Sequence, residues 1–265
     1  MIKRLTHKAM KILPPGNILQ NMYLKERVNK NNWKSFLEIG SGNGYISRIL
    51  LKKGMSGVGC DLNESACQNN KVLNREFIDS NKYQVFHQDF IELDASQKFD
   101  LIISCMVIEH LETSELENFV QKCKELLNPN GTILFLVPAS MKYWGIEDEI
   151  AGHIKRYEFD DFKYFEEKFN LKPTHLAGLT YPMSNWLFEL SNALIKKNES
   201  KILELSQKEK TVYTGNRNVP YKTTFPSVFG LFLNETFLYP LHFLQKQFRR
   251  NSNALVIYCE LQPIL

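Results

Sequence analysis

A glycine-rich segment directly after the first apolar run carries the clearest chemical signal in the sequence. It reads Glu38-Ile39-Gly40-Ser41-Gly42-Asn43-Gly44 and separates the strand-like run 36–39 from residues 45–53, which have helical spacing. Three alternate glycines let the backbone turn tightly and approach a ligand without a collision with side chains. The loop therefore predicts a small-molecule site, although the glycines alone do not say which molecule binds.

Two carboxylates follow the next two predicted strands. Asp61 ends the run 57–60, roughly 20 residues beyond the glycines, where an acidic side chain can accept hydrogen bonds from both hydroxyls of a ribose. Asp89 and Phe90 follow the run 83–87, where a carboxylate suits the exocyclic amine of an adenine and the ring would cover one face of the base. The alternative for Asp89 is a helix or turn cap.

A second polar cluster follows the fifth predicted strand. It reads Gly152-His153-Ile154-Lys155-Arg156-Tyr157 and is preceded by Glu147-Asp148-Glu149. His153 is a candidate general base or acceptor ligand, because an imidazole changes charge near neutral pH. The fork-shaped guanidinium of Arg156 is a candidate for binding an anionic group. In the structural alternative, His153 caps a helix and Arg156 pairs with Glu147 or Asp148.

Further candidates lie elsewhere along the chain. His110, after the fourth predicted strand, is the second candidate base, with a structural role as the alternative. Tyr23 could cover the ligand as part of a lid and Arg27 could anchor a carboxylate, unless their helix simply packs on the sheet. Tyr143 and Tyr157 complete the predicted substrate contacts.

The elements that must position these residues alternate between strands and helices. Strands are predicted at 36–39, 57–60, 83–87, 101–103 and 132–137, and helices at 45–53, 64–77 and 115–127. This rhythm indicates βαβ units and a doubly wound, mostly parallel α/β sheet of seven strands. Such sheets bind ligands at the carboxyl ends of their strands, near the switch point.

The pattern changes after Pro138. A loop at 139–156, a helix at 159–169 and strands at 175–181 and 254–258 are predicted, with a helical insertion before the last strand. The organisation is then a lid at 1–34, a core at 35–181, an insertion at 182–250 and a final core strand at 251–265.

The insertion is rich in aromatic residues. They could line an acceptor pocket, pack as core at helical spacing, or form a dimer face, and core packing is the default expectation. Contact with lipid-linked substrates is a further alternative, because Lys246, Arg249 and Arg250 lie nearby. The aromatic residues in question are Phe225, Phe229, Phe232, Phe237, Tyr239, Phe243 and Phe248.

Composition narrows the classes of protein. The 265 residues carry a formal net charge of +4, which is too little for a nucleic-acid-binding surface and weakly favours anionic partners. The five cysteines form no C-x-x-C pair and are expected to be reduced thiols of a cytoplasmic protein. Neither a signal peptide nor a membrane-spanning segment is expected, and no metal site is predicted.

Together these motifs resemble the class I S-adenosylmethionine-dependent methyltransferases, which have a Rossmann-like fold. The resemblance covers about residues 35–138. It rests on the segments Leu37–Gly44, Gly59-Cys60-Asp61, Phe99–Ile102 with Val107–Leu111, and Leu127–Thr132. The segment 152–157 is similar to a Gly-His-x-x-Arg-Tyr subgroup of the type 11/12 methyltransferases, often linked with sugar, polyketide or cell-envelope metabolism.

The resemblance implies a role for each cofactor-site residue. S-adenosylmethionine is the implied cofactor and S-adenosylhomocysteine the product. Glu38 would organise the glycine loop near the cofactor's amino group, while Gly40, Ser41, Gly42 and Gly44 would approach its amino-acid part. Asp61 and Leu62 would hold the ribose region, Asp89 and Phe90 the adenine, and Ser104 and Cys105 the methionine end.

The expected activity is methyl transfer to the oxygen or nitrogen of a small molecule. Rossmann dehydrogenases are the competing family, but the charge of Glu38 beside the loop would oppose a diphosphate. A nucleic-acid or protein methyltransferase is disfavoured, because Ser104-Cys105-Met106-Val107 stands where an Asn-Pro-Pro-Tyr-type motif would be expected. A non-catalytic cofactor-binding module remains an alternative, and a homodimer is compatible with the sequence.

Overall fold

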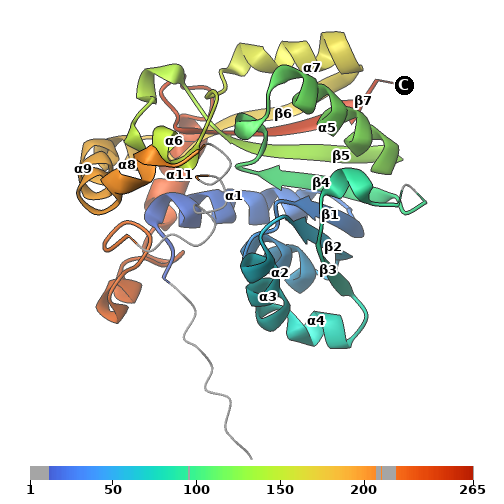
Figure 1. The fold of residues 1–265 in the computed structure, drawn as a ribbon, viewed down its shortest axis with the longest axis horizontal. Coiled ribbons are helices and arrows are strands. Elements are labelled where there is room, and N and C mark those ends of the chain that lie inside the picture. The colour runs from blue at the N-terminus through green and yellow to red at the C-terminus, as the bar shows by residue number, and fades with distance from the viewer. Residues whose placement is uncertain (1–11, 95, 207–209, 211–218, 265) are drawn as a thin grey trace, which may run out of the picture.

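The computed structural model describes residues 12–94, 96–206, 210 and 219–264. Seven strands form one sheet in the order β3-β2-β1-β4-β5-β7-β6, drawn in Figure 1. All neighbouring pairs from β3 to β5 are parallel, whereas β7 is antiparallel to both β5 and β6. The predicted fold class is confirmed. The strands are β1 (Ser35–Ile39), β2 (Ser56–Asp61), β3 (Tyr83–His87), β4 (Phe99–Cys105), β5 (Leu127–Pro138), β6 (Leu171–Leu179) and β7 (Val256–Pro263).

Helices cover both faces of the sheet (Figure 1). On one face, α5 (Thr113–Leu126) and α7 (Phe162–Phe169) bury apolar side chains against Ile102 and Phe135. On the other face, α1 (Pro15–Lys30), α2 (Tyr45–Lys52), α3 (Glu64–Leu73) and α4 (Arg75–Asp79) pack on the sheet. The strands are therefore apolar on both sides, as a parallel sheet between two helical layers requires.

The helix predicted at 64–77 is interrupted at Asn74, and the interruption bears on the site. The buried amide of Asn74 donates to the carbonyl of Gly44 at 3.1 Å and to Oδ1 of Asn70 at 2.9 Å. The helix ends there because its last residue is bonded to the glycine loop as well as to its own turn. A periodicity of apolar residues cannot show such a break.

The start of one predicted strand shifts, and one predicted loop is wrong. β6 begins at Leu171, earlier than expected, and tolerates Pro173 because it is an edge strand that pairs only with β7. The segment 139–156 contains a helix, α6 (Ile146–Ala151), whose first turn is closed by Asp148 accepting from the Gly145 N–H at 2.8 Å. That helix carries part of the site.

The insertion contains α8 (Met183–Trp186), α9 (Phe188–Glu199), 3-10 segments at Ser200–Glu204 and Ser227–Leu231, and α11 (Tyr239–Gln247). The expectation that its aromatic residues pack as core is wrong for Phe232, Phe237, Tyr239, Phe243 and Phe248, which are exposed. The described residues do not include residues 1–11 of the expected lid. They also do not include residues 207–209 and 211–218 of the insertion. No helix in the described part is both long and apolar enough to cross a membrane.

Candidate functional site

The glycine loop lies between β1 and α2, at the carboxyl edge of the sheet where the strand order switches from β1 to β4. Gly40, Gly42 and Gly44 have φ values of 68°, 50° and 80°, a conformation that favours glycine. A side chain at Gly40 would collide with Val107 of the loop after β4, whereas the space beside Gly42 is open. The loop is therefore packed at its ends and accessible at its middle.

Asp61 joins this loop to the end of β2. Its Oδ2 accepts the Gly42 N–H at 2.7 Å, and its Oδ1 accepts the Asn63 N–H at 2.8 Å. Each carboxylate oxygen has a second lone pair, so two acceptor positions are left for a ligand. Leu62, the next residue, is 67% exposed and offers an apolar contact beside them. We expected from the sequence that the glycine loop and the Asp61 carboxylate lie together, and the two are hydrogen-bonded in the structure.

Glu38 lies beneath the loop and is almost fully buried. Its Oε2 accepts the hydroxyl proton of Ser47, which in turn lies 2.6 Å from the Tyr83 hydroxyl. Burial raises the pKa of Glu38 to about 8, more than the Ser47 hydrogen bond lowers it. Ser47 and Tyr83 are thus the groups that organise Glu38, and neither stands in a sequence pattern that marks a site residue.

The pKa of Glu38 makes a prediction about stability. Between its ordinary value of 4.5 and about 8, the folded protein binds this proton more tightly than the unfolded chain. Stability is therefore lost as pH rises through that window, at about 1.4 kcal/mol per pH unit. We expect Glu38→Gln to gain on the order of 4 kcal/mol relative to wild type between pH 4.5 and 8.5. Urea unfolding followed by circular dichroism measures the difference.

Other titrating groups, including Glu109, are present in both proteins and cancel in that comparison. The exposed Glu92→Gln variant is the matched control and should track wild type at every pH. Parallel pH profiles for wild type and Glu38→Gln would show that Glu38 stays ionised in the folded state.

The adenine side of the predicted site is only partly as expected. Oδ1 of Asp89 accepts the Ile91 N–H at 3.1 Å, so Asp89 does cap a 3-10 turn, with its other oxygen left for a ligand. The role given to Phe90 is wrong, because its ring is buried in the core at 4.5 Å from the Phe119 ring. The half-exposed Ile91 is the apolar side chain beside Asp89 that faces outward.

Ser104 and Cys105 end β4, opposite the glycine loop. The Ser104 hydroxyl is buried and has no hydrogen-bond partner among the described residues. Burial holds the pKa of the Cys105 thiol above its usual range, so it is a neutral thiol rather than a nucleophile. An unpartnered buried hydroxyl at this edge marks a place where a polar ligand atom can be accommodated.

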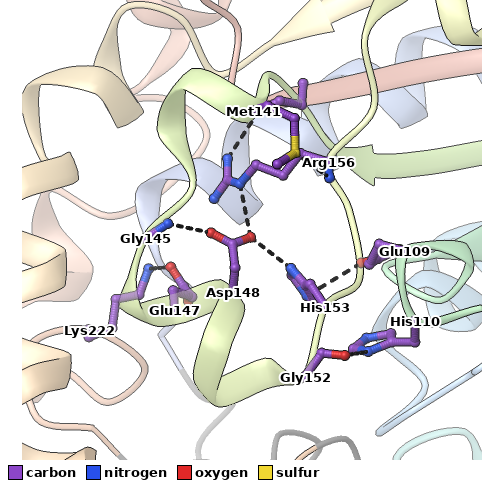
Figure 2. A network of polar contacts seen from close by, with 11 residues as sticks. Glu109, His110, Met141, Gly145, Glu147, Asp148, Gly152, His153, Arg156 and Lys222 are labelled. Atoms are coloured by element: carbon purple, nitrogen blue, oxygen red, sulfur yellow. Dashed lines mark hydrogen bonds and ion pairs between the residues drawn. The ribbon is translucent and has the colours of Figure 1, made fainter. Parts of the chain in front are cut away.

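The acceptor side is built around Asp148 of α6 (Figure 2). Its Oδ1 accepts from His153 Nδ1 at 2.8 Å and from Arg156 Nε at 2.9 Å. Burial alone would raise the pKa of Asp148, but the hydrogen bonds from His153 and Arg156 outweigh it and hold the pKa below its ordinary value. An ionised Asp148 holds a proton on Nδ1 of His153 and turns Nε2 toward Glu109.

Nε2 of His153 faces Glu109, at 3.8 Å from Oε1. Glu109 is fully buried and neither carboxylate oxygen has a hydrogen-bond partner among the described residues. Burial raises its pKa to about 7, with His153 acting in the opposite direction. Sequence reasoning missed Glu109 as a site residue, although it stands beside His110, and named Asp148 only as an alternative partner of Arg156.

His110 completes this cluster. Its Nδ1 lies 3.1 Å from the carbonyl of Gly152, and its ring meets that of His153 edge-on. Burial, reinforced by His153, lowers its pKa to about 4. One ligand atom from each of Glu109, His110 and His153 lies within 4.8 Å of the others, a set that could hold a divalent cation. The sequence expected no metal here.

Of the three remaining acceptor-side predictions, the structure contradicts two and leaves one as a candidate. Arg156 is buried and bonded to Asp148 and to the carbonyl of Ala139, so the structural alternative holds and an anion-binding role is wrong. Tyr157 is also buried and donates to the carbonyl of Ile108, which makes it a brace rather than a substrate contact. Tyr143 is half-buried, with its ring 5.4 Å from that of Phe188, and stays a candidate.

The proposed lid residues lie on the face of the sheet instead of at its edge. Tyr23 is buried against β7 with its hydroxyl 2.8 Å from His175 Nε2. Arg27 makes two hydrogen bonds to Glu260, at 2.8 and 2.6 Å. The lid interpretation of these two residues is corrected, because both side chains contact residues of β6 and β7.

Comparison with known proteins agrees with this geometry. A sequence profile described as "Methyltransferase domain" (Methyltransf_12) matches residues 37–133. A ubiquinone biosynthesis O-methyltransferase of Pasteurella multocida is 26% identical over 49% of this chain and 57% of its own. Sphingolipid C9-methyltransferase 1 of Gibberella zeae is 26% identical over 51% and 27%. This chain thus spans little more than half of the first relative and about a quarter of the second.

The fold also has solved counterparts. Magnesium protoporphyrin IX methyltransferase of Synechocystis, solved with bound S-adenosylhomocysteine, superposes with a TM-score of 0.51 at 15% identity, over 63% of this chain and 79% of that one. Sheet order, glycine loop and the match over residues 37–133 together support a class I methyltransferase domain. The family model covers residues 37–133 of this chain, and a place in the Gly-His-x-x-Arg-Tyr subgroup stays a prediction.

Proposed function

We propose that this protein transfers a methyl group from S-adenosylmethionine to a hydroxyl or amine of a small molecule. The observation that carries the proposal is the Asp61 carboxylate bonded to the Gly42 N–H at 2.7 Å, beside an open face of the glycine loop. This arrangement presents acceptors for ribose hydroxyls where the strand order switches, which is where open α/β sheets bind ligands.

The residues present fit this cofactor. The open side of Gly42 and the two spare lone pairs of Asp61 suit its ribose and amino-acid parts, exposed Leu62 suits an apolar face, and the buried Ser104 hydroxyl lacks a protein partner. When bound, the cofactor supplies an activated methyl group on a sulfonium. The protein then has to align the acceptor and exclude water.

His153 is the group proposed to accept the proton of an acceptor hydroxyl. Asp148 orients the imidazole through Nδ1, so that Nε2 would take the hydroxyl proton as the acceptor oxygen replaces the cofactor's sulfur on the methyl carbon. His110, whose pKa is about 4, is a weaker base at neutral pH and is assigned a structural role. These observations favour His153 over His110 as the proposed base.

The acceptor proposed here is a small molecule with a substantial apolar part. Two relatives carry names that refer to lipid-type compounds, ubiquinone and sphingolipid. The burial of Arg156 removes the side chain on which an anionic acceptor was predicted. All five cysteines are free thiols, which supports the proposal of a reducing, cytoplasmic location.

The test is binding followed by turnover. We expect calorimetry to show S-adenosylmethionine binding, with no heat for a nicotinamide dinucleotide, and S-adenosylhomocysteine to form with a panel of quinol, phenol and long-chain acceptors. Tight binding of the dinucleotide instead would replace the proposal with a dehydrogenase. Cofactor binding without product across the panel would favour the non-catalytic alternative.

A further inference from the structure

The helix α11 is inverted compared with an ordinary surface helix. Its buried residues are His242 and Gln245, whereas Tyr239 and Phe243 are 58% and 54% exposed. Tyr239 and Phe243 are four residues apart and therefore share one side of the helix. A helix on the surface of a globular protein normally buries its apolar side and exposes its polar side.

Specific hydrogen bonds hold α11 in this orientation. The Gln245 amide donates to the carbonyl of Leu19 at 3.0 Å and accepts the Thr180 N–H at 2.9 Å. His242 Nε2 lies 2.8 Å from a carboxylate oxygen of Glu26. These bonds tie the polar side to α1 and to the end of β6, so rotating α11 to bury its aromatic residues would break all of them.

The residues just before α11 also expose apolar side chains. The rings of Phe232 and Phe237 meet at 5.2 Å, and Leu238 between them and the helix is buried against α1 as an anchor. We call the exposed set the outer aromatic face. It consists of Leu231, Phe232, Phe237, Tyr239 and Phe243.

Basic residues border the outer aromatic face. Arg249 and Arg250 directly follow Phe248 and are exposed. Two acidic side chains nearby form ion pairs with lysines. Glu26 pairs with Lys246 at 2.9 Å, and Glu235 pairs with Lys25. The border therefore carries positive charge that the described residues do not neutralise.

We propose that the outer aromatic face docks on the surface of an anionic lipid bilayer. Aromatic and leucine side chains enter the boundary between headgroups and acyl chains, while bordering arginines contact anionic headgroups. A twofold dimer through the same face is the competing occupant, but it would place the arginines of both copies in one interface. The negative charge of the bilayer attracts the arginines, whereas the arginines of two copies would repel one another in a dimer interface.

This inference deepens the proposed function, on which it rests for the nature of the acceptor. The insertion touches the acceptor side directly, through Lys222 Nζ to Glu147 Oε2 of α6 at 3.0 Å and through the ring contact of Phe188 with Tyr143. Docking would bring α6 and its neighbours to the bilayer, from which an apolar acceptor could be taken.

Flotation of the full-length protein with lipid vesicles tests the inference, in the absence of S-adenosylmethionine. We expect binding to vesicles of phosphatidylcholine with 40% phosphatidylglycerol to exceed binding to pure phosphatidylcholine by about tenfold. The Phe237→Ser/Phe243→Ser variant should lose about tenfold of that binding. The control is Val72→Ser, another exposed apolar residue, on α3, which should bind like wild type.

Each result has one meaning. Equal binding of wild type and the double serine variant, or no binding by wild type, overturns the inference. A wild-type dimer that becomes monomeric on Phe237→Ser/Phe243→Ser in sedimentation velocity, without vesicle binding, assigns the face to a second copy and also overturns it. Calorimetry with S-adenosylmethionine on the same variant should be unchanged, so loss of docking is distinguishable from failure of the proposed function.

Discussion

Replacing Asp61 by asparagine is expected to weaken S-adenosylmethionine binding by about 100-fold. The carboxylate accepts the Gly42 N–H at 2.7 Å and the Asn63 N–H at 2.8 Å, and each of its oxygens keeps a second lone pair. An amide has one acceptor oxygen instead of two and carries no charge. Loss of two hydrogen bonds to a charged group is worth about 3 kcal/mol, which corresponds to the stated factor.

Isothermal calorimetry measures the affinity, and thermal unfolding of the unliganded protein checks that the variant is folded. Asp79→Asn is the matched control, because Asp79 is exposed on α4 and pairs only with Arg75 in its own helix turn among the described residues. An affinity of Asp61→Asn within threefold of wild type would remove the ribose contact from the site.

Replacing His153 by alanine is expected to lower kcat by about 100-fold or more for a hydroxyl acceptor, with little change in S-adenosylmethionine affinity. General base catalysis contributes about 10²- to 10⁴-fold. Asp148→Asn should also lower kcat, because an amide no longer fixes the His153 proton on Nδ1. His110→Asn should have a smaller effect, because burial already holds the pKa of His110 near 4.

Two additions separate a base from the other roles of His153. Added imidazole should partly restore turnover of His153→Ala, which a merely structural defect would not allow. Wild-type turnover should survive a chelator. Loss of turnover on chelation, with recovery on adding Mn²⁺, would instead make Glu109, His110 and His153 a metal site. Unchanged kcat in His153→Ala would exclude both roles.

The cofactor side could be predicted from sequence because its signals are local. The glycine loop and Asp61 each follow a strand directly, and parallel strands bring their carboxyl ends to one edge. The prediction that Phe90 covers the adenine was wrong, because an aromatic residue beside a carboxylate has the same sequence pattern whether its ring points to a ligand or to Phe119. Only the packing of α5 on the sheet decides between them.

For the acceptor side, the sequence predicted which segment carries the candidate residues but not which of their side chains stay available. His153 and Arg156 were both found by residue type, but which of them stays available depends on Asp148, whose helix α6 has no strong periodicity. The inversion of α11 is likewise invisible in sequence, since Gln245 is buried only because Leu19 and Thr180 present backbone partners to it. Distant backbone groups determined these outcomes.

The placement of β7 has a consequence for biosynthesis. Strands β1 to β5 find their parallel neighbours among segments translated at about the same time, but β6 pairs only with β7. A nascent chain that has emerged as far as the insertion therefore holds the apolar residues of β6, Ala177 and Leu179 among them, without a partner strand. Until the ribosome delivers β7, this edge is open to chaperones and to aggregation.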